Sequence, residues 1–442
     1  MSSPVLVETS QLESARPHWS FGARIAFRFA VLYFGLFSVC TQILTSLLPL
    51  PGVDIPDPGS LPPLRQIIGF VAQHVFHLQV TPAFFAETGS GDRPCDWVFL
   101  FCVLVVSIGG TILWSLLDRR RGDYGSLRNW FWLFFRFALA GQMFIYAFAK
   151  IVPLQMPFPA LFRLLEPVGN LSPMGMLWTS IGASPAYEIF AGSAEFLGGL
   201  LLLIPRTRTL GALVCVADMT QVFLLNMTYD VPVKILSFNL ILLSLLLLTP
   251  EVRRLANFFF LNRTAEAPVR TPLFRSARKN RIAAALQALF AVVLIGSNAW
   301  GARIGWKTYG AGVPKPALYG IWNVDEQTVD GQSRPPLFTD SGRWRRILID
   351  DYHLMIFLHM NDERVYYSLA IDEKAGTLRL SDRVSNQQKA LLTYTRPAPD
   401  RLLLDGAMDG HKLHLELSLY DRNKFLLVSR GFHWVSPVPF NR

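Results

Sequence analysis

Charged residues are scarce in this sequence. They make up 17% of the 442 residues, against about 25% in a typical soluble domain. Hydrophobic residues account for 51% of the chain and the mean hydropathy is +0.31, which argues against a disordered, fibrous or ordinary soluble protein. The four cysteines are too few for a disulfide scaffold. The composition therefore favours a membrane protein.

Long apolar stretches are confined to the first 302 residues. A helix needs about 20 mostly apolar residues to cross a bilayer core. Seven stretches meet this need and are predicted to span a membrane: 22–49, 96–117, 129–152, 187–204, 209–229, 233–249 and 282–302. The sequence then predicts four parts: a tail with two spans and an outer loop (1–128), a four-helix core (129–250), a basic loop with the seventh span (251–302), and a β domain (303–442).

The distribution of Lys and Arg predicts the orientation, because these residues resist translocation in short loops. The basic loops are 118–123, 205–208 and 250–281, and seven spans place all three on one side. The alternate loops carry only Arg65, Arg93 and Arg163. We therefore expect a cytoplasmic N-terminus and an extracytoplasmic C-terminal domain. The net charge of +10 then reflects orientation and attraction to anionic lipid, and no nucleic-acid partner is expected.

The C-terminal domain has the pattern of short strands. Between His411 and Leu419 every second residue is leucine from Leu413 onward, which is typical of a half-buried strand. Further strands are predicted at 344–350, 353–360, 364–371, 376–381, 390–396, 401–405 and 424–435. Eight or nine strands with short connections predict an antiparallel barrel or a small sandwich.

The segment Tyr319-Gly320-Ile321-Trp322 opens this domain with a Gly-x-Trp sequence. It resembles the opening of lipocalin-like barrels. In that family a basic side chain on the last strand packs over the tryptophan, and Arg430 is the counterpart that the resemblance implies. The aromatic residues form either a plain core or the lining of a cavity for a lipid or an apolar cofactor: Trp322, Trp344, Tyr366, Tyr367, Phe432 and Trp434.

Ionisable groups inside the predicted spans are expensive to bury and are candidates for function. A rise of about 1.5 Å per residue puts Arg136 and Asp218 at similar depth, so we expect a buried ion pair between them. Glu195 is the candidate proton acceptor, with Lys150 as its cationic neighbour and Tyr146 as the third catalytic candidate. The remaining members of the polar cluster are Gln221, Asn226 and Asp230. The alternative is that these groups pair only to hold the helices together.

Metal and haem chemistry have little support. None of the eight histidines lies in a predicted span, so a haem embedded in the bilayer would lack ligands. The cysteines form no Cys-x-x-Cys motif and no iron–sulfur spacing. The pair His74 and His77 supplies two ligands, which do not make a site. No metal site is predicted.

Two motifs carry a family resemblance. The first is Phe144-Ile145-Tyr146-Ala147-Phe148-Ala149-Lys150, and the second runs from Ala191 to Arg208, with an acid before a glycine pair, a leucine run and an arginine turn. Residues from about 130 to 250 resemble the DoxX-like family of four-helix bacterial membrane proteins. The resemblance implies a bacterial inner-membrane protein with a quinone- or sulfur-linked redox role. A partner subunit or a quinone would supply the electrons.

Other functions stay open at this point. The chain is alternatively a non-catalytic membrane scaffold or lipid-binding protein whose outer β domain binds a lipid or a partner. A transporter is disfavoured because the spans show no inverted repeat. The order of helical spans and β domain is also similar to membrane enzymes related to vitamin K-dependent carboxylase, in which a lysine at the membrane edge acts as the base. Lys150 is the candidate for that role, by fold-level analogy alone.

Overall fold

The computed structural model describes residues 19–48, 55–265 and 272–441. The N-terminal tail, the end of the first predicted span at residue 49 and part of the basic loop lie outside these residues. The chain divides into two compact units. The helical unit takes the described residues up to Gln155 together with Ala186–Trp306, and the barrel unit takes Met156–Pro185 and the residues from Lys307 onward.

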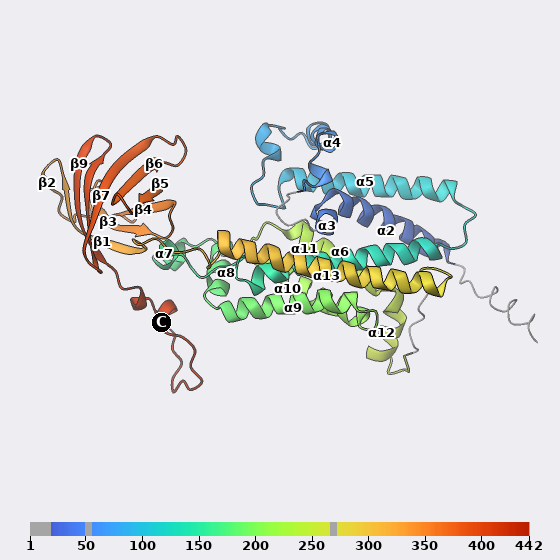
Figure 1. The fold of residues 1–442 in the computed structure, drawn as a ribbon. Coiled ribbons are helices and arrows are strands. Elements are labelled where there is room, and N and C mark those ends of the chain that lie inside the picture. The colour runs from blue at the N-terminus through green and yellow to red at the C-terminus, as the bar shows by residue number, and fades with distance from the viewer. Residues whose placement is uncertain (1–18, 49–54, 266–271, 442) are drawn as a thin grey trace, which may run out of the picture. The chain divides into compact units, whose positions relative to one another are not determined.

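Seven helices in the described part of the chain are long and apolar enough to cross a membrane. Each predicted span is helical, which confirms that part of the fold prediction (Figure 1). The helices are α2 (Phe21–Cys40), α5 (Pro94–Leu117), α6 (Gly125–Ile151), α9 (Pro185–Leu203), α10 (Arg208–Thr228), α11 (Lys234–Leu248) continued by α12 (Val252–Phe259), and α13 (Ala277–Thr308). Shorter helices are α3 (Gln42–Thr45), α4 (Pro62–His74), α7 (Leu161–Leu164) and α8 (Pro173–Gly182).

Helix α6 forms the centre of the helical unit. Its middle third alternates small and large apolar residues, and a run of these is fully buried: Ala138, Leu139, Ala140, Met143, Phe144 and Ala147. The small side chains let neighbouring helices approach closely, and the large ones fill the remaining space. Polar groups placed on α6 near this core are therefore shielded from the surroundings of the bundle.

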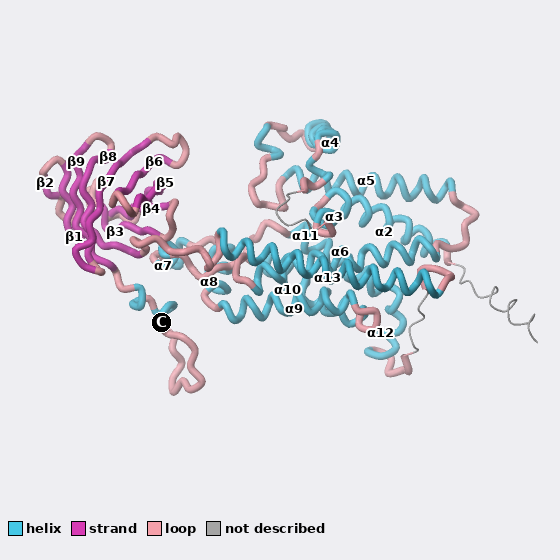
Figure 2. The backbone as a smooth tube through the Cα atoms, in the orientation of Figure 1, coloured by secondary structure: helices cyan, strands magenta, loops and turns pink. Residues whose placement is uncertain are grey.

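The strands form a closed antiparallel barrel of eight strands, with each strand paired to the next and β9 paired back to β1 (Figure 2). The strands are β1 (Gly320–Val329), β3 (Trp344–Ile349), β4 (Leu354–His359), β5 (Arg364–Asp372), β6 (Thr377–Asp382), β7 (Gln388–Ala398), β8 (Arg401–Met408) and β9 (His411–Leu419). A short strand, β2 (Gln332–Ser333), pairs with the far end of β1. The prediction of a barrel is confirmed, and the helical part followed by a barrel is the observed order.

Apolar side chains fill the barrel interior. Trp322 is 0% exposed, and its indole Nε1 donates to the Leu318 carbonyl at 2.9 Å. Leu413, Leu415 and Leu417 of β9 are buried with it, as the alternating pattern predicts. The fully buried side chains of this cluster make a packed core of the kind expected in a small barrel.

The predicted strand at 424–435 is wrong. Residues Arg422–Lys424 form a single 3-10 turn, Leu426–Ser429 form the short helix α14, and the following residues are irregular. Because β9 pairs with β1, the closed sheet leaves no edge for another strand. Phe432 and Trp434 are 77% and 91% exposed, so they do not belong to the barrel core.

The side chain over Trp322 also differs from the prediction. Arg396 of β7 lies 5.8 Å from the Trp322 ring centroid. Arg430 instead lies 4.6 Å from the ring centroid of Phe440, in the irregular C-terminal segment. The predicted role of Arg430 fails because its segment is not the last strand.

The outer wall of the barrel is covered at β1, β3 and β4 by the chain between α6 and α9. Leu161 packs into a buried cluster with Ile321, Leu348, Ile356 and Leu358. The Leu161 amide donates to Asp350 Oδ2 at 3.0 Å, and Glu166 forms an ion pair with Arg364. These strands are buried on both faces, which explains why β3 and β4 contain continuous apolar runs. The sequence-based boundaries place residues 156–185 in the helical core, whereas they pack with the barrel.

Candidate functional site

The strongest candidate site is a buried ion pair between α6 and α9. Lys150 lies in the last turn of α6, and its Nζ donates to Oε1 of Glu195. The Lys150 and Glu195 side chains are 9% and 2% exposed. A buried charge needs a partner and further hydrogen bonds to be stable. This pair either only holds the two helices together or also binds a ligand or transfers a proton.

Glycines on α9 bring the two charges together. A Cβ added at Gly192 would lie 2.7 Å from both the Ala147 carbonyl oxygen and the Lys150 Cβ. A Cβ at Gly199 would lie 2.9 Å from the Phe144 ring. Gly192, Glu195 and Gly199 are three and four residues apart, so they lie on one face of α9. The absence of side chains at both glycines lets that face approach α6 until Glu195 reaches Lys150.

A hydrogen-bond chain between α6 and α3 lies beside the pair. Tyr146 lies one turn before Lys150, whose Nζ is 5.8 Å from the Tyr146 ring centroid. Gln42 Nε2 donates to the Tyr146 hydroxyl at 3.0 Å and to Gln142 Oε1 at 2.9 Å. The Gln142 side chain is fully buried and donates back to the Gln42 carbonyl at 3.2 Å. The three predicted catalytic candidates are thus brought together, with two glutamines that complete a polar chain.

Asp218 adds a second carboxylate from α10. It interacts electrostatically with both Glu195 and Lys150. The buried Oδ2 of Asp218 and Oε2 of Glu195 each have no hydrogen-bond partner. Unsatisfied buried oxygens are rare, because leaving them unpaired costs about 1–3 kcal/mol each. Two carboxylates near one ammonium also leave one negative charge in excess, which a bound proton would neutralise.

Arg136 lies apart from this cluster, and the predicted ion pair with Asp218 is not formed. Arg136 Nη2 instead donates to Gln287 Oε1 of α13 at 2.6 Å. The rise per residue gave the two side chains similar depths, but depth does not determine the direction in which a helix presents a side chain.

The other predicted members of the cluster have separate positions. Asn226 is buried and donates to Ser237 Oγ at 3.0 Å, which ties α10 to α11. Asp230 is exposed and pairs with Lys234 at 3.0 Å. Gln221 is exposed on α10. Asn226 and Asp230 therefore serve contacts between neighbouring elements, and Gln221 makes no contact with the Lys150–Glu195 pair.

Arg28 of α2 is another buried charge, and it was not predicted from the sequence. Its Nε donates to the Tyr124 hydroxyl at 2.8 Å, Nη1 to Ser115 Oγ at 2.8 Å, and Nη2 to the Asp118 carbonyl at 2.7 Å. The Tyr124 hydroxyl in turn donates to Asp118 Oδ2 at 2.8 Å. Burial in this network raises the pKa of the Tyr124 hydroxyl above its ordinary value. Every donor group of Arg28 is satisfied locally, so this network fastens α2 to the end of α5 and offers no open position to a ligand.

No group of three or more His, Cys, Asp or Glu side chains is placed to hold a metal among residues 19–48, 55–265 and 272–441. The cluster does contain hydrogen-bond donors and acceptors that could contact a polar organic ligand. The hydrogen-bond donors of the cluster are the Tyr146 hydroxyl and the Lys150 ammonium. Its acceptors are the unpartnered oxygens of Glu195 and Asp218.

Comparison with known proteins gives one relative that bears on the family. The chain is 35% identical to the uncharacterized protein YwoB of Bacillus subtilis (strain 168) over 125 residues, which are 28% of this chain and 79% of YwoB. The chain belongs to the YwoB family. No family model matches the chain, and no solved structure matches it. Because YwoB is uncharacterized, membership of the YwoB family carries no activity, and the function has to be argued from the site.

Proposed function

We propose that the chain is a DoxX-like integral protein of the bacterial inner membrane whose Lys150–Glu195 cluster serves quinone- or sulfur-linked redox chemistry, as an accessory to a partner subunit. The observation that carries the proposal is the contact between the two motifs of the resemblance. The first motif ends in Lys150 and the second contains Glu195, and these side chains form the buried ion pair. The motifs are therefore two halves of one polar site.

The chemistry of the cluster fits a quinone head group. Quinone oxygens accept hydrogen bonds, which Tyr146 and Lys150 can donate, and the hydroxyls of the reduced form need acceptors such as Glu195 Oε2. Aromatic rings flank the pair, with Phe196 of α9 at 5.4 Å from Phe144 and 5.7 Å from Phe148 of α6. A bound quinone would supply the electron transfer. The residues of the chain would orient its ring, exclude water and hold a proton on Glu195.

The barrel unit supports a proposed orientation of the chain. The segment that leaves α6 and enters α9 packs with the barrel, and α13 leads into the same barrel. This agrees with seven spans, in which both connections would lie on one side of a membrane. Since the basic loops mark the opposite side as cytoplasmic, we propose an extracytoplasmic barrel. A thiol-reactive probe that cannot cross the membrane should label Ser385→Cys in the barrel of intact cells, and absence of labelling contradicts this orientation.

The redox proposal is tested by extraction of the protein purified from native membranes. Organic solvent should release a quinone, identified by its absorbance and mass, at about one molecule per chain. Glu195→Gln and Lys150→Met should each lose it, and so should the double variant Lys150→Met/Glu195→Gln, in which neither member of the pair is left alone and which should remain produced and folded. Asp230→Asn is the matched control, because that carboxylate lies outside the cluster, in the turn between α10 and α11, and this variant should retain the quinone. Wild-type protein without any quinone contradicts the proposal.

A scaffold or lipid-binding function is the second candidate. The observation that favours it is that the ion pair and the tight glycine contact of Gly192 are also sufficient to fasten α9 to α6. This function predicts no chromophore and co-purification of a partner protein or a phospholipid. A pulldown from native membranes, with mass spectrometry of proteins and lipids, separates the two candidates.

A further inference from the structure

The chain between α3 and α5 presents an unusual apolar surface. Residues 61–80 form α4 and the extended segment after it, and they are not among the spanning helices. Phe70 is 62% exposed and Ile67 54% exposed on the outer side of α4. Val75 and Phe76 continue the surface beyond the helix, at 53% and 42% exposed. A polar connection exposed to water would not carry so many large apolar side chains in sequence.

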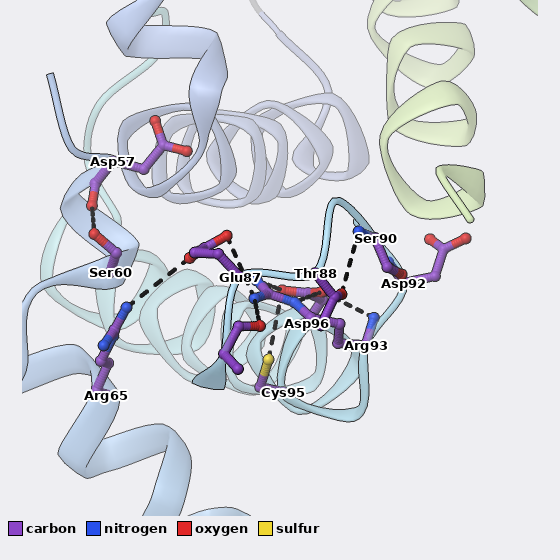
Figure 3. Close-up of polar contacts among 11 residues, drawn as sticks. Asp57, Ser60, Arg65, Glu87, Thr88, Ser90, Asp92, Arg93, Cys95 and Asp96 are labelled. Carbon is purple, nitrogen blue, oxygen red and sulfur yellow. Dashed lines mark hydrogen bonds and ion pairs between the residues drawn. The ribbon is translucent and has the colours of Figure 1, made fainter. Parts of the chain in front are cut away.

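The opposite side of this segment is fixed to the ends of the helices. Ile68 and Ala72 of α4 pack against Cys95 and Val98 in the first turns of α5. Figure 3 shows the polar contacts beside this packing, where Arg93 lies between Glu87 and Asp96.

These polar contacts hold the following loop in place. Arg93 pairs with Asp96 at 2.9 Å and with Glu87 at 3.5 Å, and it donates to the Ala86 carbonyl at 2.8 Å. The hydrogen bond to Asp96 raises the pKa of Arg93 above its ordinary value. Arg65 of α4 reaches Glu87 at 4.0 Å and lies over the Phe85 ring. Arg65, Glu87 and Arg93 thus pair with one another, whereas Ile67, Phe70, Val75 and Phe76 remain exposed.

The apolar surface continues onto α5. The Phe76 ring meets the Phe101 ring edge-on at 5.0 Å. Phe101 is seven residues beyond the start of α5 at Pro94, which places it roughly 10 Å along the helix. Around it α5 exposes Trp97, Leu104 and Val105, on the face that would meet lipid. Phe76 is therefore at a depth below the charged first turn of α5.

We propose that residues 61–80 are an interfacial element that is embedded in the bilayer leaflet at which α5 begins. The occupant of its apolar surface is lipid, because that surface is continuous with the outward face of a spanning helix. The segment contains Arg65, His74 and His77 and no acidic residue, so no carboxylate of its own opposes contact with anionic headgroups. The depth at Phe101 agrees with the roughly 5–10 Å that interfacial helices reach below the headgroups. The inference rests on the proposed membrane insertion.

Photocrosslinking tests the inference on the full chain. p-Benzoylphenylalanine replaces Phe70 or Phe76, and the protein is irradiated in vesicles of phosphatidylethanolamine and phosphatidylglycerol before mass spectrometry. We expect phospholipid adducts at both positions, at least tenfold above those at Thr88, an exposed loop position that serves as the control. Only variants with wild-type thermal unfolding are scored, and Ile67 provides an alternative position if one of them unfolds early.

Two results overturn the inference. Adducts to protein, whether a second copy or another chain, show that the surface is a protein interface, and lipid adducts no more frequent than at Thr88 show that it faces water. A probe at Leu104 of α5 separates this failure from that of the underlying proposal. Lipid adducts at Leu104 without adducts at Phe70 or Phe76 leave membrane insertion intact and refute only the interfacial element.

Discussion

Gly192 of α9 lies directly against Lys150 of α6. A Cβ at Gly192 would approach the Lys150 Cβ to 2.7 Å and the Ile151 amide nitrogen to 2.9 Å. Backbone atoms of a buried helix cannot move aside as a flexible side chain can. The contact therefore sets the distance between the two helices, and with it the geometry of the Lys150–Glu195 pair.

We expect Gly192→Ala to destabilise the protein by about 1–3 kcal/mol, because the methyl group would force α9 away from α6. The free energy of unfolding in detergent measures this effect. Gly296→Ala is the matched control, since a Cβ at this position of α13 meets nothing within 4 Å. The control should be neutral or stabilised by up to about 1 kcal/mol, as alanine favours helix. Equal effects at both positions would show that the close contact is unimportant.

Lys150→Met and Glu195→Gln should each destabilise the helical unit by about 3–5 kcal/mol, because each leaves part of a buried polar pair without its partner. The double variant Lys150→Met/Glu195→Gln should recover most of the loss, because neither member of the pair is then left as a buried charge without its partner. Unfolding free energies of the four proteins form a double-mutant cycle. Additive losses in the double variant would mean that the two side chains are not coupled.

Asp92 provides the N-terminal cap of α11 from a distant part of the chain. Its carboxylate accepts hydrogen bonds from the Lys234 amide at 2.8 Å and the Ile235 amide at 2.9 Å. Asp92→Ala should cost about 0.5–2 kcal/mol in unfolding free energy, the usual loss for a removed cap. Asp230→Asn is the control, because that exposed side chain pairs with Lys234 and caps nothing, and asparagine tolerates the positive φ of this position. If the Asp230 variant lost as much unfolding free energy as Asp92→Ala, the loss would come from the ion pair with Lys234 and not from the missing cap.

His414 on the barrel surface should titrate above its ordinary range. Its Nδ1 hydrogen-bonds to Asp405 Oδ1 at 2.6 Å. This hydrogen bond raises the pKa of His414 above its ordinary value of 6.5. Since the folded-state pKa is raised, the stabilisation is complete below about pH 6.5 and is lost as the pH rises through the folded-state value. The side chain is 38% exposed, so screening limits the contribution to about 0.5 kcal/mol.

An NMR titration of the histidine ring resonances measures this shift. Asp405→Asn should return the pKa of His414 toward 6.5. Glu416→Gln should have a smaller effect, because the Glu416 carboxylate is 3.8 Å from His414 Nε2. An unchanged midpoint in Asp405→Asn would refute the assigned cause.

Periodic features of the sequence determined most of the fold prediction. The seven apolar stretches and the leucines of β9 were identified because their spacing alone specifies a buried surface. Lys150 was also predicted to be the cationic neighbour of Glu195, since ionisable groups inside apolar spans need partners. Features that depend on distant partners were not accessible, because no local pattern records them. Closure of the barrel removed the predicted strand at 424–435, and the rotation of α6 and α10 separated Arg136 from Asp218.

The burial of Arg28 could not be predicted from the sequence for a different reason. Arg28 stands among aromatic residues near the start of α2, where an arginine is expected to extend toward the membrane surface. Its burial depends on Tyr124 and Ser115, which lie 96 and 87 positions away. The only local signal is a charged residue inside an apolar run, and that signal alone does not distinguish a buried network from a side chain that reaches water.

The cover of the barrel wall has a consequence for the order of assembly. Leu161 meets Asp350 across 189 positions and Glu166 meets Arg364 across 198, with four spanning helices between them. During synthesis the covering segment emerges long before the strands that it shields. The barrel can therefore complete its outer wall only on a segment that is already held at both ends by α6 and α9. A fragment that begins after α13 would contain every strand and still expose Ile321, Leu348 and Ile356, which makes it prone to aggregation.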